Sequence, residues 1–247
     1  MNGGPFQVLV AARRPAPPAR AISRLVVAGA GGALGNEVIR RLVGRDQFDN
    51  TEVLAREPIR TGLRGVRTQV IEGDPATWPA TDADTALVMF DPPRMFHQRE
   101  RALWTPHPQQ LPALAAWLRG SGVRTLAVVL PHAQGRLPEA LKRGLASLDE
   151  QSLAALGFER LLIIRSAQAP ARSAPGGRLP ALASWMLSIA AYMVPSSEQP
   201  VRAVKVAQFV AAALELAPPG IHVAAPETVW QAAQGDPRAT VRQWLAA

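Results

Sequence analysis

The chain contains no cysteine, and this absence excludes several kinds of chemistry. Disulfide bonds, zinc–thiolate sites and thiol nucleophiles all require a thiol. A chain without cysteine suits a reducing compartment, so we expect a cytoplasmic location. Histidine is scarce as well, and the few that occur are too scattered to predict a metal site: His97, His107, His132 and His222.

Acidic residues are outnumbered by basic ones, 19 to 27, which gives a formal net charge of +8. Half of this excess comes from Arg13, Arg14, Arg20 and Arg24, in a stretch that has no acid. In the rest of the chain the two signs are interspersed and form no basic stripe. The charge distribution therefore does not favour a nucleic acid as a partner.

Long apolar runs are also missing. The most hydrophobic run, from Leu179 to Val194, is shorter than a membrane span requires. It predicts a buried helix or an apolar flap beside a substrate, with at most peripheral membrane contact. The segment 166–178 before it has the Ala, Pro and Gly content of a mobile linker.

The length of 247 residues, 48% of them hydrophobic, suits one α/β domain. Residues 1–23 are rich in Pro, Ala and Arg and predict a disordered basic arm. We therefore expect the folded domain to cover residues 24–247. Within it, residues 178–247 are expected to form a small helical C-terminal part on the substrate side.

The most informative stretch begins with a short apolar run, Leu25 to Ala28, typical of a strand buried on both faces. A glycine-rich turn follows, and then apolar residues recur at helical spacing from Val38 to Val43. A strand, a glycine turn and a helix in this order predict a loop that binds a diphosphate at the start of the helix. The alternative is an ordinary tight turn without a ligand. The predicted binding residues are Gly29, Ala30, Gly31, Gly32, Ala33, Leu34 and Gly35.

Further apolar runs alternate with helical patterns along the chain, which predicts a doubly wound parallel sheet. The expected later strands are 51–55, 66–71, 85–90 and 123–130, followed by one near 163 and a last one at 221–223. In such sheets the ligand binds at the carboxyl ends of the strands, where the strand order reverses.

Three motifs carry a resemblance to a known family. Gly29, Gly32 and Gly35 have the GxxGxxG spacing of extended and atypical short-chain dehydrogenase/reductases. The segments Leu156–Ser166 and Pro200–Ala207 resemble one branch of that family, the Tat-interacting tumour-suppressor oxidoreductase with its bacterial relatives and the NmrA-like group. The resemblance covers about residues 24–233. It implies a Rossmann-like fold and a nicotinamide dinucleotide as cofactor.

The residue after the second strand selects the cofactor in such folds. Arg56 stands there and could hold the 2′-phosphate of NADP bidentately, with Arg60 assisting. Glu57 could instead accept the ribose hydroxyls of NAD. Arg56 favours NADP(H) over NAD(H), and a solvated surface charge is the alternative interpretation of this arginine.

Two acidic residues follow later strands. Asp74 resembles the Asp that contacts the adenine amino group in atypical reductases, although Gly73-Asp74 is also a common turn. Asp91 follows the fourth strand and has two open interpretations. It is either a polar group at the nicotinamide half of the cleft or a cap before the proline turn.

The catalytic dyad of the family is missing. Short-chain reductases use Tyr-x-x-x-Lys, but the single tyrosine is Tyr192, far from the expected helix. Aligned on Gly157, the family's Tyr falls near Lys142 and its Lys near Ala146. The catalytic residues are therefore unknown, and His132 and Lys142 are candidates for the acid, each with a surface role as the alternative.

Two functions fit this sequence. One is an NADP(H)-binding reductase acting on a small carbonyl substrate with a non-standard acid. The alternative is a non-catalytic regulatory protein that senses NADP(H) and binds a protein partner. The sequence leaves open whether the protein is an enzyme.

Overall fold

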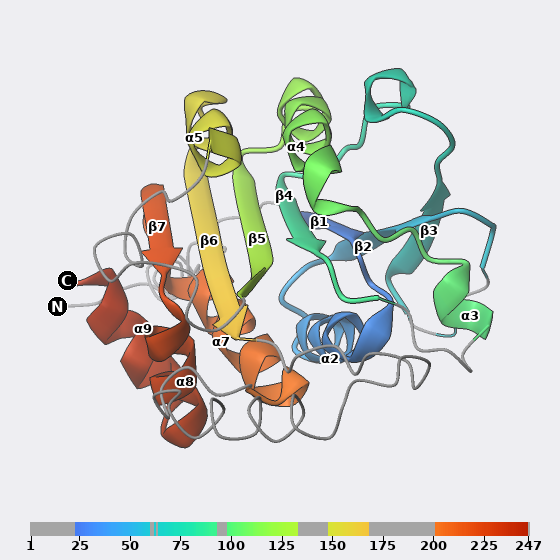
Figure 1. Cartoon of the computed structure of the whole chain (residues 1–247). Helices are drawn as coiled ribbons and strands as arrows, with labels where there is room; N and C mark the ends of the chain where they lie inside the picture. The colour runs from blue at the N-terminus through green and yellow to red at the C-terminus, as the bar shows by residue number, and fades with distance from the viewer. Residues whose placement is uncertain are drawn as a thin grey trace, which may run out of the picture.

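A parallel seven-stranded sheet organises the computed structural model, which describes residues 23–59, 62, 64–92, 98–132, 148–167 and 201–246 (Figure 1). The strand order is β3-β2-β1-β4-β5-β6-β7, and every pairing is parallel. The strands are β1 Arg24–Ala28, β2 Asn50–Ala55, β3 Val66–Val70, β4 Thr85–Met89, β5 Thr125–His132, β6 Arg160–Ala167 and β7 Gly220–Ala224. From β1 the chain moves outward to β3, returns to β4 beside β1, and then moves the other way. This order confirms the predicted doubly wound sheet and places its reversal between β1 and β4.

The two faces of the sheet are covered by different helices (Figure 1). On one side lie α2 Gly32–Val43, α7 Ala203–Leu216, α8 Pro226–Gln234 and α9 Pro237–Leu245; on the other lie α4 Leu111–Gly120 and α5 Leu148–Ala155. Successive strand residues point to opposite faces. Val27 therefore belongs to the core under α2 and α7, whereas Val26 belongs to the core under α4. Both faces are buried, which explains why the central strands are apolar without alternation.

The described C-terminal region completes the sheet and one of its helix layers. β7 pairs with β6, and α7 packs beside α2. Just after α2, Gln47 Nε2 donates to the carbonyl of Ala211 in α7 at 3.3 Å. Residues 201–246 are thus an integral part of the sandwich. The predicted substrate-side role of 178–247 stays a prediction, because residues 178–200 lie outside the described residues.

β1 starts at Arg24, one residue before the predicted apolar run Leu25 to Ala28. Residues 1–22 of the expected basic arm lie outside the described residues, and so does the apolar run 179–194. Among the helices that the structure describes, none is both long enough and apolar enough to cross a membrane.

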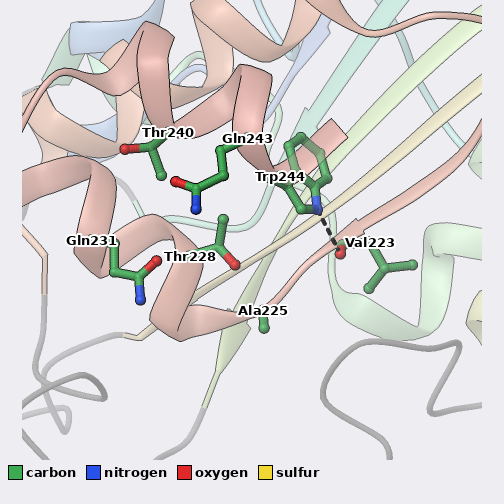
Figure 2. A pocket seen from close by; sticks show the side chains of 7 residues that line it. All are labelled: Val223, Ala225, Thr228, Gln231, Thr240, Gln243 and Trp244. Atoms are coloured by element: carbon green, nitrogen blue, oxygen red, sulfur yellow. Dashed lines mark hydrogen bonds between the residues drawn. The ribbon is translucent and has the colours of Figure 1, made fainter. Parts of the chain in front are cut away.

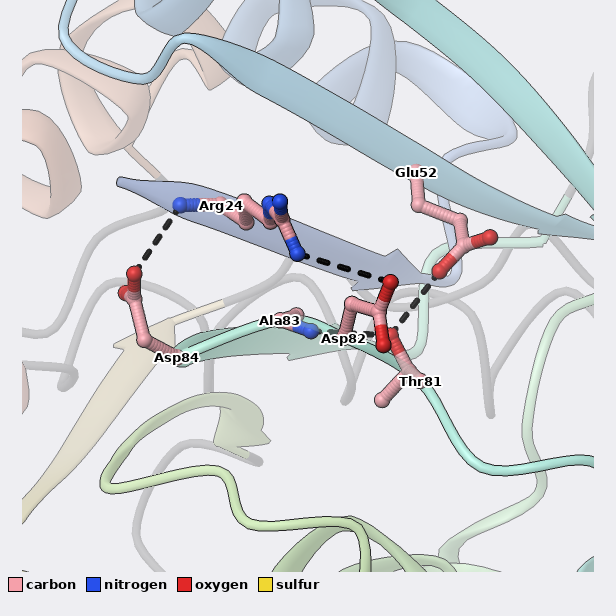
Figure 3. Close-up of polar contacts among 6 residues, drawn as sticks. All are labelled: Arg24, Glu52, Thr81, Asp82, Ala83 and Asp84. Carbon is pink, nitrogen blue, oxygen red and sulfur yellow. Dashed lines mark hydrogen bonds and ion pairs between the residues drawn. The ribbon is translucent and has the colours of Figure 1, made fainter. Parts of the chain in front are cut away.

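The amino ends of the strands are joined by polar contacts (Figure 3). The Arg24 N–H donates to Asp84 Oδ2 at 3.0 Å, and the Arg24 guanidinium pairs with Asp82 at 3.4 Å. Thr81 Oγ1 donates to Glu52 Oε2 at 2.8 Å. A pocket of about 300 Å³ opens beside them. This edge lies opposite the carboxyl ends of the strands, where a doubly wound sheet binds its ligands.

Candidate functional site

The glycine loop lies at the carboxyl end of β1, at the reversal of strand order, and leads directly into α2. Gly29 and Gly32 both have φ of +77°, a conformation that favours glycine. A Cβ on Gly29 would lie 1.8 Å from the carbonyl oxygen of Met89 in β4, and one on Gly35 would lie 2.4 Å from the carbonyl of Ala30. All three glycines of the GxxGxxG pattern therefore have a backbone reason to be glycine.

The first turn of α2 presents backbone N–H groups, which a helix cannot satisfy by itself. Its N-cap, Gly31, provides no side-chain cap, and the turn contains no acid. These are the donors that an anion would use in a dinucleotide-binding loop.

Two carboxylates from outside the helix accept hydrogen bonds from this turn. The Gly32 N–H donates to Glu100 Oε2 at 3.2 Å, and the Leu34 N–H donates to Asp91 Oδ2 at 3.1 Å. Asn36 Nδ2 donates to Glu100 Oε1 at 2.8 Å and to the carbonyl of Gly32 at 2.7 Å. The chain itself thus supplies anionic groups at the start of α2.

Glu100 belongs to the connection between β4 and α4, which crosses the carboxyl ends of β1 and β2. After the short α3, Gln98–Arg101, the Gly29 N–H donates to the carbonyl of Trp104 at 3.0 Å. The Arg56 N–H donates to the carbonyl of Ala102 at 2.7 Å, and the Trp104 N–H donates to the carbonyl of Leu54 at 3.0 Å. This segment is fixed to both strands by backbone hydrogen bonds.

A tryptophan cluster anchors the same segment on its far side. The rings of Trp104 and Trp78 meet edge to face with centroids 5.0 Å apart, and Trp78 meets Trp117 of α4 at 5.3 Å. All three are buried, and such pairs add about 0.5–1.5 kcal/mol each beyond their burial. The connection is thus held both by the strands and by the core under α4.

The sequence left two roles open for Asp91, and the structure shows one contact that its side chain makes. Its carboxylate binds the start of α2, 57 residues earlier in the chain. Glu100 and Asn36 were not predicted. Glu100 lies in a polar connection that carries no motif, and the only local signal for Asn36 is its position one helical turn after Gly32.

The predicted selectivity residues lie near the same edge. Arg56 and Glu57 directly follow β2, and both are exposed. Asp74 is the N-cap of the 3₁₀ helix η1, Pro75–Thr77, and its Oδ1 accepts a hydrogen bond from the Ala76 N–H at 2.9 Å. The cap explains this residue without a ligand, and its adenine contact stays a prediction. Arg60 lies outside the described residues.

The candidate acids are only partly described. His132 is the last residue of β5, and its side chain, like the whole of Lys142 and Tyr192, lies outside the described residues. Their catalytic roles therefore stay predictions.

A buried ion pair that the sequence did not predict lies near the carboxyl end of β6. Arg165 Nη2 lies 2.7 Å from Glu150 Oε2, and Arg165 Nε lies 3.3 Å from Glu150 Oε1. The two side chains are 2% and 6% exposed. The pair holds α5 against β6, and its fork geometry is the bidentate arrangement that arginine and carboxylate prefer.

A pocket of about 390 Å³ lies elsewhere, between β7, α8 and α9 (Figure 2). Its walls carry uncharged polar side chains, among them Thr228, Gln231 and Gln243. Trp244 closes one side, where its Nε1–H donates to the carbonyl of Val223 at 3.1 Å. The glycine loop follows β1, and β4, β5 and β6 lie between β1 and β7 in the sheet, so this pocket is separate from the loop.

Neither a protein-family model nor a curated protein sequence matches the chain. Several solved structures are similar. A Rossmann-fold NAD(P)-binding family protein from Shigella flexneri is 15% identical, with 68% of this chain and 86% of that one covered and a TM-score of 0.38.

Two enzyme structures are similar at the same level. The Bordetella bronchiseptica enzyme WbmF, in complex with NADH, is 11% identical over 81% of this chain and 70% of its own, with a TM-score of 0.46. A UDP-glucuronic acid 4-epimerase variant from Bacillus cereus, in complex with NAD and a fluorinated UDP-sugar, is 16% identical over 78% and 73%, with a TM-score of 0.42. The assignment of a Rossmann-like fold rests on the strand order of this chain itself.

Proposed function

We propose that this protein binds a nicotinamide dinucleotide at the glycine loop, in the manner of the atypical short-chain reductases. The observation that carries the proposal is the loop itself. Gly29 and Gly32 are in the left-handed conformation, Gly35 packs on the loop backbone, and the N-terminal end of α2 lies at the reversal of strand order. Strand, loop and helix together form the framework that brings a diphosphate to a helix N-terminus.

The residues present fit such a ligand once two side chains have moved. The N–H groups of Gly32 and Leu34 would donate to the diphosphate, in place of Glu100 and Asp91. Arg56, exposed at the end of β2, would bind the 2′-phosphate and so favour NADP(H) over NAD(H). We also propose that the protein is cytoplasmic.

The bound dinucleotide would supply hydride-transfer chemistry, but the family's acid is missing from this chain. Without Tyr-x-x-x-Lys, a reductase would need another proton donor, and His132 at the end of β5 or Lys142 would serve. The substrate class would be a small carbonyl compound.

A second function is favoured by the missing dyad and by the carboxylates on the loop. In this alternative the protein senses NADP(H) and regulates a protein partner without turnover. Binding of a partner that differs between NADPH and NADP⁺, with no NADPH oxidation on a panel of aldehydes and ketones, would favour the sensor over the reductase.

Titration with NADPH and with NADH, followed by nucleotide fluorescence, tests the proposed function. In Arg56→Ala we expect NADPH binding to weaken by about 10- to 100-fold, because a hydrogen-bonded charge contributes roughly 1.5–3 kcal/mol. NADH binding should change little. Arg64→Ala is the matched control, because Arg64 is exposed before β3, at the opposite edge of the sheet. If the folded wild type binds neither nucleotide, the glycine loop is only structural.

A further inference from the structure

Two anionic oxygens occupy the donors of the glycine loop, one on the Gly32 N–H and one on the Leu34 N–H. A dinucleotide presents two phosphoryl groups, linked to each other, to the same turn of a Rossmann helix. We propose that Asp91 and Glu100 form a carboxylate latch, an internal substitute for the diphosphate that the dinucleotide must displace.

Glu100 is the more deeply buried half of the latch. It is 5% exposed, and its two oxygens accept from two different groups, the Gly32 N–H and Asn36 Nδ2. The backbone that carries Glu100 is held on β1 and β2 through the carbonyls of Trp104 and Ala102. A charge buried this deeply is stable only when it is hydrogen-bonded, which the loop donors provide.

Asp91 is the more accessible half. It follows the last residue of β4 by only two positions, is partly exposed, and contacts the loop through the Leu34 N–H. Its approach depends on the absence of a side chain at position 32. A Cβ on Gly32 would lie 2.9 Å from Asp91 Cβ and 2.7 Å from the carbonyl oxygen of Pro92. Gly32 therefore accommodates the latch as well as the ligand.

The latch lowers the apparent affinity for the dinucleotide in two ways. The donors are available only in the fraction of molecules in which the carboxylates have moved away, and the apparent affinity falls by that fraction. Carboxylates that remain nearby also repel the diphosphate, because both are negatively charged. This inference rests on the proposed function, since it concerns regulation of the same site.

The test measures NADPH binding to the full chain for wild type, Asp91→Asn and Asp91→Ala. Asn keeps the shape and a neutral acceptor but loses the charge, whereas Ala removes the acceptor. We expect both variants to bind NADPH about tenfold more tightly than wild type, which corresponds to about 1.4 kcal/mol. Asp82→Asn is the control. It removes the same charge from a side chain that is 90% exposed at the amino edge of the sheet, and should bind like wild type.

Amide hydrogen exchange provides a second readout that needs no nucleotide. The Leu34 N–H should exchange faster in Asp91→Ala than in wild type or Asp82→Asn, because its acceptor is gone. Unchanged exchange at Leu34 would overturn the latch.

The outcomes separate the two proposals. If wild type binds NADPH and both Asp91 variants bind it no more tightly, the latch is overturned and the dinucleotide site stands. If circular dichroism shows that all of these proteins are folded and none of them binds NADPH, the proposed function is overturned. The latch is then overturned with it. Tighter binding by both Asp91 variants but not by Asp82→Asn supports both proposals.

Discussion

Replacing Gly35 with alanine should destabilise the protein, although alanine is the better helix former. The added Cβ would lie 2.4 Å from both the carbon and the oxygen of the Ala30 carbonyl. Ordinary van der Waals contact begins at about 3.4 Å, so helix and loop would have to separate by about 1 Å. The helix has no room to retreat, because α7 packs against it and Gln47 ties the chain after α2 to Ala211.

The magnitude follows from two opposing effects. Overpacking costs about 1–3 kcal/mol, and a contact with backbone rather than a flexible side chain belongs at the upper end. Replacing glycine with alanine inside a helix stabilises the helix by about 1 kcal/mol. The expected net loss is therefore about 2 kcal/mol in the free energy of unfolding. For a protein of this size, this corresponds to a fall in Tm of about 4–8 °C.

Gly120→Ala is the matched control for this substitution. Gly120 is also helical, at the end of α4, but a Cβ there would meet nothing within 4 Å. We expect this variant to be as stable as wild type or more stable by up to about 1 kcal/mol. Urea denaturation of wild type, Gly35→Ala and Gly120→Ala measures the differences in the free energy of unfolding. The slopes of this free energy against urea concentration should be equal. If Gly35→Ala and Gly120→Ala had the same free energy of unfolding, the close packing of α2 on the loop would be refuted.

Two further predictions concern stability. Glu150→Ala should lower the free energy of unfolding by about 3–5 kcal/mol, because it leaves the buried Arg165 guanidinium without its carboxylate partner. Glu159→Ala, at an exposed position before β6, should change it by less than about 0.5 kcal/mol, and equal urea midpoints for the two variants would contradict the role of the pair. Asp236→Ala should cost about 1 kcal/mol, because Asp236 Oδ1 caps α9 through the Arg238 N–H at 3.0 Å. Asp236→Ser, which keeps a capping oxygen, should recover most of this loss when the variants are compared by urea denaturation.

The sheet was predictable because its signals are local. Val26 and Val27 lie in an apolar run that can be recognised from the sequence alone. A doubly wound sheet requires a core on each face, and the two residues belong to these two cores. Most strand boundaries were accurate to within two residues, but the predicted start of the linker was wrong, because Ser166 and Ala167 belong to β6. β5, expected at 123–130, runs over Thr125–His132, where its last residues pair with Ser166 and Ala167 of β6. Pairing with a neighbour extends a strand beyond its apolar run, and that pairing is not visible locally.

The candidate site was predictable only in its glycines. The contact between Glu100 and Gly32 spans 68 residues, and no spacing rule connects them. Charged residues in a polar connection predict a solvated surface, yet Glu100 is buried because the backbone of its segment follows the ends of β1 and β2. The partner of Asp91 could not be predicted from the sequence either. Its position after a strand placed it at the correct edge of the sheet but left its partner undetermined.

The loop donors need a partner whether or not a ligand is bound, because a buried N–H without an acceptor is costly. In this chain Glu100 and Asp91 meet that need, because each accepts a hydrogen bond from one of the two donors, Gly32 N–H and Leu34 N–H. The segment that supplies Glu100 also accepts a hydrogen bond from the Arg56 N–H. A movement of Glu100 that involves its backbone would therefore reach the residue proposed to select NADP(H). The diphosphate and 2′-phosphate ends of the proposed site are in this way connected through residues 100–104, and their contributions to binding should not be independent.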